Sequence, residues 1–219
     1  AQCLVGSEMC IRDRDMSRRT GGEIYLGIVG PVRTGKSTFI KRFMELVVIP
    51  EMSDDNEKVR TIDELPQSAD GKTIMTTEPK FIPKEAAVIH FSNQETGKIR
   101  LIDCVGYLVP EAVGAIEEEK ERMVKTPWSE EEIPFSKAAE IGTSKVIREH
   151  SNLGLIITTD GSFGDIPAVN FEEALQKTVM ECEKAGKPFL ILVNTSRPDS
   201  QETIQFTKRL EAQYGNCLL

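Results

Sequence analysis

The sequence predicts an α/β domain of three layers, in which helices cover both faces of a mostly parallel sheet. Two observations predict this fold class. Short apolar runs alternate along the chain with segments whose apolar residues recur at helical spacing. The apolar runs LGLII (153–157) and FLILV (189–193) are also far shorter than the roughly 18 residues needed to span a bilayer, and they suit buried strands or helix faces.

The elements follow from these patterns in chain order. An apolar strand is expected at 23–29 and a helix at 36–48, where Phe39, Ile40, Phe43, Leu46 and Val47 are spaced for one helix face. The polar, proline-containing segment 50–80 is expected to be a long loop. Strands at 86–92 and 98–103, joined by the turn NQETG, predict an antiparallel hairpin. Helices are then expected at 111–125, 136–149, 170–186 and 201–214, with strands at 153–158 and 188–193.

Composition narrows the class of protein. The 219 residues are 39% hydrophobic and 28% charged, so the chain can bury a core. A net charge of −8 disfavours non-specific binding to nucleic acid. The five cysteines are odd in number and include no CxxC pair, which fits a reducing cytosol better than a disulfide framework or a zinc site.

The two ends of the chain are expected to lie outside the folded pattern. Residues 1–16 have no strand or helix periodicity, and GSEMCIRDR resembles a translated sequencing adapter, so this leader is taken as non-native or disordered. Residues 17–219 are expected to form the domain. The end, YGNCLL, follows the last predicted helix without a further element, which suggests a fragment of a longer protein.

A phosphate-binding loop is predicted between the first strand and the first helix. Residues 30–38, GPVRTGKST, match GxxxxGK[ST]. The glycines let successive backbone N–H groups and the helix N-terminus surround a phosphate. Lys36 is expected to reach the β- and γ-phosphates, and Ser37 to coordinate Mg²⁺. The nucleotide contacts predicted from this loop are Gly30, Arg33, Thr34, Gly35, Lys36, Ser37 and Thr38.

A second motif is expected to organise magnesium and detect the γ-phosphate. DCVG (103–106) follows a strand and resembles the DxxG element of Ras-like GTPases, which gives Asp103 and Gly106 those two roles. Such enzymes also place a magnesium-binding threonine between the two motifs. Thr76 and Thr77 are both candidates as catalytic residues, and Thr77 is placed with Ser37 and Asp103 in the expected magnesium site.

The element that reads guanine in Ras-like GTPases is altered. In place of [NT]KxD the sequence has NTSR, in which Asn194 remains as a nucleotide contact and Arg197 replaces the aspartate. Arginine offers only donors, so it cannot accept hydrogen bonds from the guanine edge. ATP is therefore the expected nucleotide. Tyr107 also stands where Ras-like enzymes place the water-orienting glutamine, which predicts slow hydrolysis.

Arg33 occupies the loop position at which several GTPases of this class carry a potassium-binding asparagine. Its guanidinium is a candidate for supplying positive charge to the transferred phosphate in cis. The alternative is an arginine that faces solvent on the outside of the loop.

Several segments together are similar to the stage IV sporulation protein A family of spore-coat morphogenetic ATPases. They include GPVRTGKSTFIKRFMELVVIP, TIMTTEPKFIP, LIDCVGY, TPWSEEEIPF and ITTDGSFGDIP. The resemblance covers about residues 17–214. It implies a P-loop NTPase of the Ras-like (TRAFAC GTPase) type that uses ATP, and a longer protein with middle and C-terminal domains.

The resemblance also implies a cellular role. ATP-dependent self-assembly would form a shell at the forespore surface, in the mother-cell cytoplasm, with a small amphipathic membrane-bound peptide as anchor and other coat proteins as clients. Two alternatives remain open at this point: a GTPase switch that controls a partner, and a nucleotide-binding scaffold with negligible hydrolysis.

Overall fold

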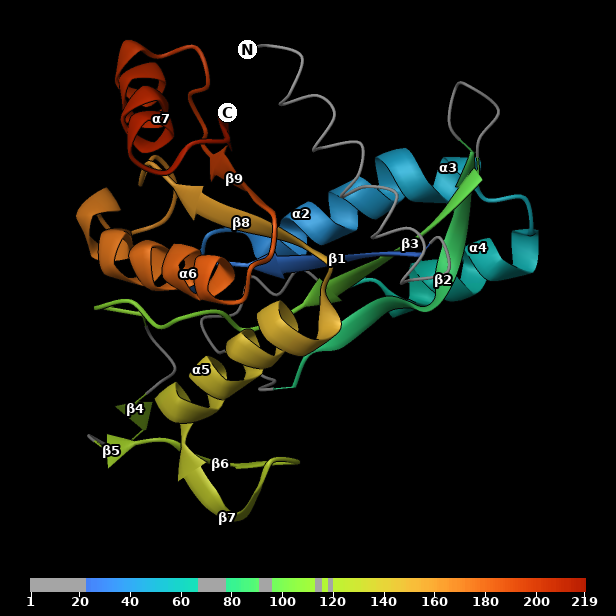
Figure 1. Cartoon of the computed structure of the whole chain (residues 1–219), viewed down its shortest axis with the longest axis horizontal. Helices are drawn as coiled ribbons and strands as arrows, with labels where there is room; N and C mark the ends of the chain where they lie inside the picture. The colour runs from blue at the N-terminus through green and yellow to red at the C-terminus, as the bar shows by residue number, and fades with distance from the viewer. Residues whose placement is uncertain (1–22, 67–77, 91–95, 113–115, 118–119) are drawn as a thin grey trace.

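Figure 1 shows the chain in a computed structural model, which describes residues 23–66, 78–90, 96–112, 116–117 and 120–219. The predicted leader at 1–16 lies outside these residues. Within the described part of the chain, no helix is both long and apolar enough to cross a membrane.

A six-stranded sheet forms the centre of the domain, in the order β10-β9-β8-β1-β3-β2. All neighbouring strands are parallel except the β2–β3 pair at one edge, which is antiparallel. This arrangement confirms the predicted mostly parallel sheet. The strands are β1 (Glu23–Val29), β2 (Lys80–His90), β3 (Thr96–Asp103), β8 (Leu153–Thr159), β9 (Phe189–Asn194) and β10 (Cys217–Leu218).

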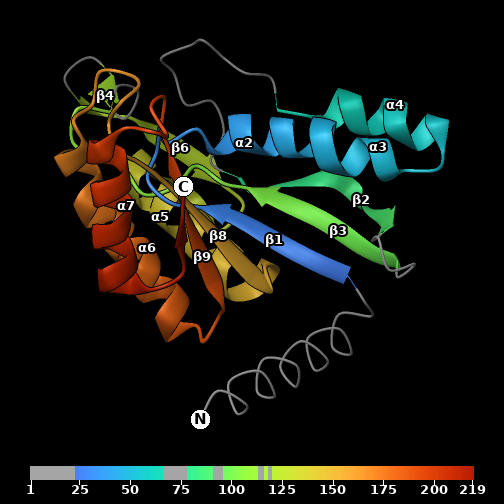
Figure 2. The same ribbon diagram turned by 90° about the horizontal axis from the view of Figure 1, so that it is seen from above.

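Helices cover both faces of the sheet, as Figure 2 shows from above. On one side, α2 (Lys36–Phe43) continues through the π-helical turn η1 (Met44–Val48) into α3 (Ile49–Glu51), with α4 (Asp55–Glu64) beside them. The other side carries α5 (Phe135–Lys145) with its π-helical extension η2 (Val146–His150), the short 3₁₀ helix η3 (Ala168–Phe171), α6 (Glu172–Lys184) and α7 (Gln201–Tyr214). The three predicted layers are therefore present.

Alternation along the strands produces a separate core on each face. In β8, Leu155 and Ile157 belong to the cluster under α2, whereas Ile156 between them faces the cluster under α5 and α6. The first cluster includes Ile40 and Met44 from the α2 side. Residues of the same strands therefore pack into both cores. The carboxyl ends of the parallel strands lie at one edge of the sheet, beside the phosphate loop.

Three sequence predictions are wrong. The segment YGNCLL does hold a further element after α7, because β10 pairs in parallel with β9. Segment 50–80 is not a continuous loop, because α4 forms within it. The side chain of Asp54 caps this helix by accepting hydrogen bonds from the backbone N–H groups of Asn56 and Glu57, at 2.7 and 3.1 Å. The cap and the acidic first turn are a helix-start signal that the prolines and glycine of this segment obscured.

The predicted helix at 111–125 is replaced by short strands. These are β4 (Ile116–Glu117), β5 (Lys120–Glu121) and β6 (Met123–Thr126), the last of which pairs with β7 (Ser129–Pro134). Helix propensity is a weak guide where no continuous apolar face can be buried. The backbone here finds partners across hairpins, and Phe135 N–H donates to Arg122 C=O at 2.8 Å at the start of α5.

Candidate functional site

The phosphate loop joins β1 to α2, as the sequence predicts, and two of its glycines have left-handed backbone angles. Gly30 has a φ of 126°, and a Cβ there would lie 2.5 Å from the Ile157 carbonyl oxygen. Gly35 has a φ of 89°, and a Cβ would lie 2.4 Å from Asn194 Nδ2. The loop therefore needs glycine at these positions for both conformation and space.

Lys36 begins α2 and turns back into the loop. Its Nζ donates to the Pro31 carbonyl oxygen at 2.5 Å and lies 3.5 Å from that of Gly30. The side chain is 5% exposed, and burial lowers the pKa of the amine, partly opposed by the charge of Asp103. A buried ammonium beside loop carbonyls is well placed to meet an anion that enters the loop.

Ser37 and Asp103 come together from the start of α2 and the end of β3. The Ser37 hydroxyl donates to Asp103 Oδ2 at 2.8 Å, while the buried Oδ1 has no hydrogen-bond partner within the described chain. Burial raises the pKa of Asp103, against the hydrogen bond from Ser37 and the charge of Lys36. Mg²⁺ prefers hard oxygen ligands of this kind, so the unpaired carboxylate oxygen and the hydroxyl fit such an ion.

The residues after Asp103 bring β3 against the phosphate loop. Gly106 has a φ of 93°, and a Cβ there would lie 2.1 Å from the Gly30 carbonyl oxygen and 2.7 Å from Lys36 Nζ. The Tyr107 carbonyl accepts from Val32 N–H at 2.9 Å. Gly106 is thus held against the loop, and its contact with the γ-phosphate stays a prediction.

Tyr107, at the position of the water-orienting glutamine of Ras-like enzymes, is buried. It is 8% exposed, and burial raises the pKa of its phenol well above the usual value. It lines a cavity of about 430 Å³ between α5 and α6. A buried phenol with a raised pKa stays neutral at pH 7, and the slow hydrolysis expected from this position stays a prediction.

Asn194 has a role that sequence reasoning did not give it. Its Nδ2 donates to the Thr34 carbonyl oxygen at 3.0 Å, so the end of β9 is tied to the phosphate loop. Thr34 is fully buried and its hydroxyl donates to the Pro31 carbonyl at 3.0 Å. Asn194 and the exposed Thr38 border a cavity of about 320 Å³ next to the loop. The signal that could have suggested this contact is the meeting of parallel strand ends at one sheet edge.

Arg33 lies within the phosphate loop, between Val32 and Thr34. It is exposed, has a φ of 64°, and its guanidinium pairs with no described residue. Arg197, at the altered guanine-reading position, is also exposed, and its backbone N–H donates to Thr195 Oγ1 at 3.0 Å. The structure thus gathers the predicted loop residues with Asp103, Gly106 and Asn194. Thr76 and Thr77 lie outside the described residues.

Comparison with known proteins decides the family. Residues 9–219 match the family described as "Stage IV sporulation protein A, ATPase domain". The chain belongs to this family. Over 201 residues it is 55% identical to the Stage IV sporulation protein A of Bacillus subtilis (strain 168) and 54% identical to that of Bacillus anthracis. The protein of the same name from Clostridioides difficile (strain 630) is 49% identical over 200 residues.

The match is nearly complete for the chain but not for its relatives. These alignments cover 91–92% of the chain and 41% of each relative. The chain therefore spans about two fifths of the length of the stage IV sporulation protein A sequences it matches. The family membership agrees with the resemblance drawn from the sequence segments, and the α/β fold with its phosphate loop fits a P-loop NTPase.

Proposed function

We propose that this domain binds and hydrolyses Mg-ATP, and that the full-length protein uses hydrolysis to drive its self-assembly into the basement layer of the spore coat. The observation that carries the chemistry is the junction of Ser37 with Asp103 beside Lys36. It combines a buried ammonium, a hydroxyl and an unpaired carboxylate oxygen at one loop. The family description, which names an ATPase domain, supports the same reaction.

The residues of the site have separate roles in binding the phosphates, the magnesium ion and the base. Backbone N–H groups of the loop and the Lys36 ammonium bind the phosphates, and Gly106 faces the terminal one. Ser37, Asp103 and either Thr76 or Thr77 would hold the magnesium ion, which when bound neutralises charge on the phosphate oxygens. Asn194 keeps the base side of the site in register with the loop. Tyr107, in place of a water-orienting glutamine, makes slow turnover part of the proposal.

The Ras-like (TRAFAC GTPase) type of P-loop fold is part of this proposal. The central strand β1 lies between β3 and β8, and β2 runs antiparallel at the edge next to β3. The phosphate loop, the DCVG segment and the NTSR segment follow β1, β3 and β9, whose ends lie along one edge of the sheet with the end of β8 between those of β1 and β9. This arrangement supports the proposed type.

The cellular role rests on the names of the relatives. Self-assembly into a homopolymer, location at the forespore surface in the mother-cell cytoplasm, anchoring by a small amphipathic membrane-bound peptide and recruitment of other coat proteins are proposals for the whole protein. The acidic net charge of −8 gives no support for a nucleic-acid partner.

Hydrolysis assays on the full-length protein test the reaction. Lys36→Ala should abolish tight ATP binding, because it removes the cation on the β- and γ-phosphate oxygens. Asp103→Ala should slow hydrolysis more than it weakens binding, and its defect should depend on magnesium concentration. Phosphate release at the parental rate from both variants would place the active site elsewhere. A scaffold without hydrolysis would show nucleotide binding but no phosphate release from the parent.

A further inference from the structure

One carboxylate organises the base side of the nucleotide site. Asp160 follows β8, and its Oδ1 accepts the backbone N–H of Ser162 at 2.9 Å. Its Oδ2 accepts two hydroxyls, from Thr195 at 2.7 Å and Thr203 at 2.6 Å. Thr195 directly follows β9, and Thr203 lies in the first turn of α7. Asp160 therefore connects the end of β8 to residues 35 and 43 positions later in the sequence, at the end of β9 and the start of α7.

The carboxylate also fixes the direction of the surrounding hydrogen bonds. Hydrogen bonds from Ser162, Thr203 and Thr195 outweigh its partial burial and lower the pKa of Asp160 to about 2, so it is ionised at neutral pH. An ionised carboxylate only accepts. Thr195 must donate to it, which leaves the Thr195 oxygen free to accept the backbone N–H of Arg197 at 3.0 Å.

Asp160 also fixes the direction of the hydrogen bonds at the start of α7. Thr203 must also donate to Asp160, so its oxygen accepts from the Ser200 hydroxyl at 2.8 Å. Ser200 in turn accepts the backbone N–H of Thr203 at 3.1 Å, which caps the helix. The backbone that carries Arg197 is therefore held at Thr195 and at Ser200 by contacts that depend on this carboxylate, beside two hydrogen bonds between Ser196 and Ser162 that do not involve it.

This network adjoins the phosphate loop. Asn194, the residue before Thr195, donates to the Thr34 carbonyl oxygen. The loops after β8 and β9 also leave the sheet at the carboxyl ends of parallel strands, the edge at which ligands bind in such folds.

We propose that Asp160 is the positioning residue for nucleoside recognition. It holds the 194–200 loop, with Arg197 in place of a guanine reader, in the conformation that accepts an adenine nucleotide. Asp160 acts through the chain, since its Oδ1 accepts the Ser162 N–H and its Oδ2 accepts the hydroxyls of Thr195 and Thr203. The inference rests on the proposed function, because it concerns the same site.

Asp160→Asn tests this in the full-length protein. The substitution keeps the shape but turns one oxygen into an N–H₂ donor, so either Ser162 N–H or the two hydroxyls lose their acceptor. We expect the Kd values for ATP and ADP to rise about tenfold together, and the ratio of the ATP and GTP Kd values to change at least threefold. Binding of inorganic tripolyphosphate, which has no base or ribose, should stay within twofold of the parent.

Asp199→Asn is the matched control. Asp199 lies in the same loop, is exposed, and forms no hydrogen bond with a described residue, so this variant should bind all four ligands like the parent. Thr203→Val removes one donor to Asp160 with little change in side-chain size. It serves as the second variant where Asp160→Asn folds poorly, and we expect it to reproduce part of the loss of nucleotide affinity.

Two results would overturn the proposal: parental ATP affinity in Asp160→Asn, or an equal loss of tripolyphosphate binding, which would mark general damage. A parent that prefers GTP would refute the proposed nucleotide while leaving this test intact, because the comparison of nucleotide with tripolyphosphate does not depend on which base is preferred.

Discussion

The identity of some residues is limited by the space around them as well as by their chemical role, and two glycines show this. Gly106 and Gly164 both have left-handed φ angles, of 93° and 76°. A Cβ on Gly106 would lie 2.1 Å from the Gly30 carbonyl oxygen, a backbone atom that cannot move aside cheaply, whereas a Cβ on Gly164 would have nothing within 4 Å. Both glycines therefore have a backbone conformation that favours glycine, but only Gly106 also lacks space for a Cβ.

Gly106→Ala and Gly164→Ala separate these costs. Each variant should lose about 1 kcal/mol of unfolding free energy for the left-handed conformation. Gly106→Ala should lose roughly 1–3 kcal/mol more from the clash, and it should also bind ATP more weakly. Urea unfolding curves measure the difference. Equal stability of the two variants would show that the loop moves freely away from Gly106.

Arg33 carries a prediction about monovalent cations. Because its charge belongs to the loop itself, hydrolysis by the full-length protein should not differ between sodium and potassium buffers. Arg33→Asn should lower the rate in sodium, and its folding stability should not fall, since asparagine tolerates a φ of 64° better than arginine does. Potassium stimulation of the parent by severalfold would contradict this role, as would unchanged turnover in Arg33→Ala.

Asp160 predicts a pH dependence of stability. Its pKa is lowered in the fold to about 2, below the ordinary value of 3.8, so the native state favours the ionised form. The resulting stabilisation is fully present above about pH 5 and is lost as the pH falls through about 2. Between these limits Asp160→Asn should lose less stability than the parent in acid-unfolding titrations. Superimposable pH profiles would show that the hydrogen bonds to Asp160 add nothing.

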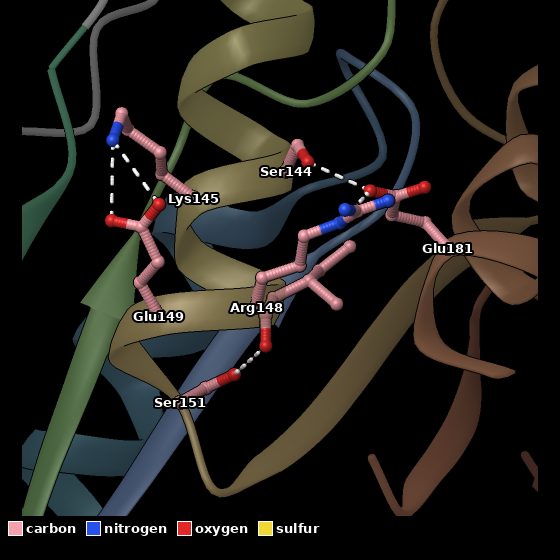
Figure 3. Close-up of polar contacts among 7 residues, drawn as sticks. Ser144, Lys145, Arg148, Glu149, Ser151 and Glu181 are labelled. Carbon is pink, nitrogen blue, oxygen red and sulfur yellow. Dashed lines mark hydrogen bonds and ion pairs between the residues drawn. The ribbon is translucent and has the colours of Figure 1, made fainter. Parts of the chain in front are cut away.

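At the scale of elements, α5 and α6 are joined by one carboxylate. Glu181 of α6 accepts from Ser144 Oγ at 2.7 Å and from Arg148 Nε at 2.6 Å (Figure 3). Its side chain is 15% exposed, and the Arg148 hydrogen bond, with that of Ser144, lowers the pKa of its carboxyl despite partial burial. Glu149, in η2, instead pairs with Lys145 at the end of α5, one turn earlier along the same continuous helix, and its side chain is 55% exposed.

Glu181→Ala and Glu149→Ala should therefore differ in cost. We expect Glu181→Ala to lower the free energy of unfolding by about 1 kcal/mol or more, because two donors lose their shared acceptor. Glu149→Ala should stay within about 0.5 kcal/mol of the parent, as exposed pairs within a helix usually do. Thermal or urea unfolding of both variants measures this. Equal losses would mean that α5 and α6 are held by packing alone.

The sequence predicts an element well where its apolar spacing and its end signals agree, whereas α4 escapes prediction despite its Asp54 cap because prolines and a glycine surround it. The helix at 201–214 matches α7 at both ends, where Ser200 caps its start and Gly215 follows its end. The helix at 111–125 was wrong because its helix-forming residues have no shared apolar face to bury. The contacts of Asp160 were not predicted, since they join positions 160, 195 and 203, and no local pattern reports such pairing.

In the whole molecule, the sequence motifs predict which residues form the site, and the order of the strands determines how those residues are arranged. Residues 30–38, Asp103 and Asn194 lie at the ends of three different strands, and the order β9-β8-β1-β3 brings these strand ends to one edge. Sequence spacing predicted that they belong to one site. It did not show that Asn194 bonds the Thr34 carbonyl, because that contact depends on how β9 is placed beside the loop.

The choice of ATP over GTP is the central claim for the whole domain, and competition binding with Mg²⁺ tests it most directly. One labelled nucleotide bound to the protein is displaced by ATP and by GTP in parallel, with Lys36→Ala as the control for specific binding. Because Arg197 offers no acceptor to guanine, ATP should compete at least as well as GTP. A preference for GTP of tenfold or more, about 1.4 kcal/mol, would contradict the account.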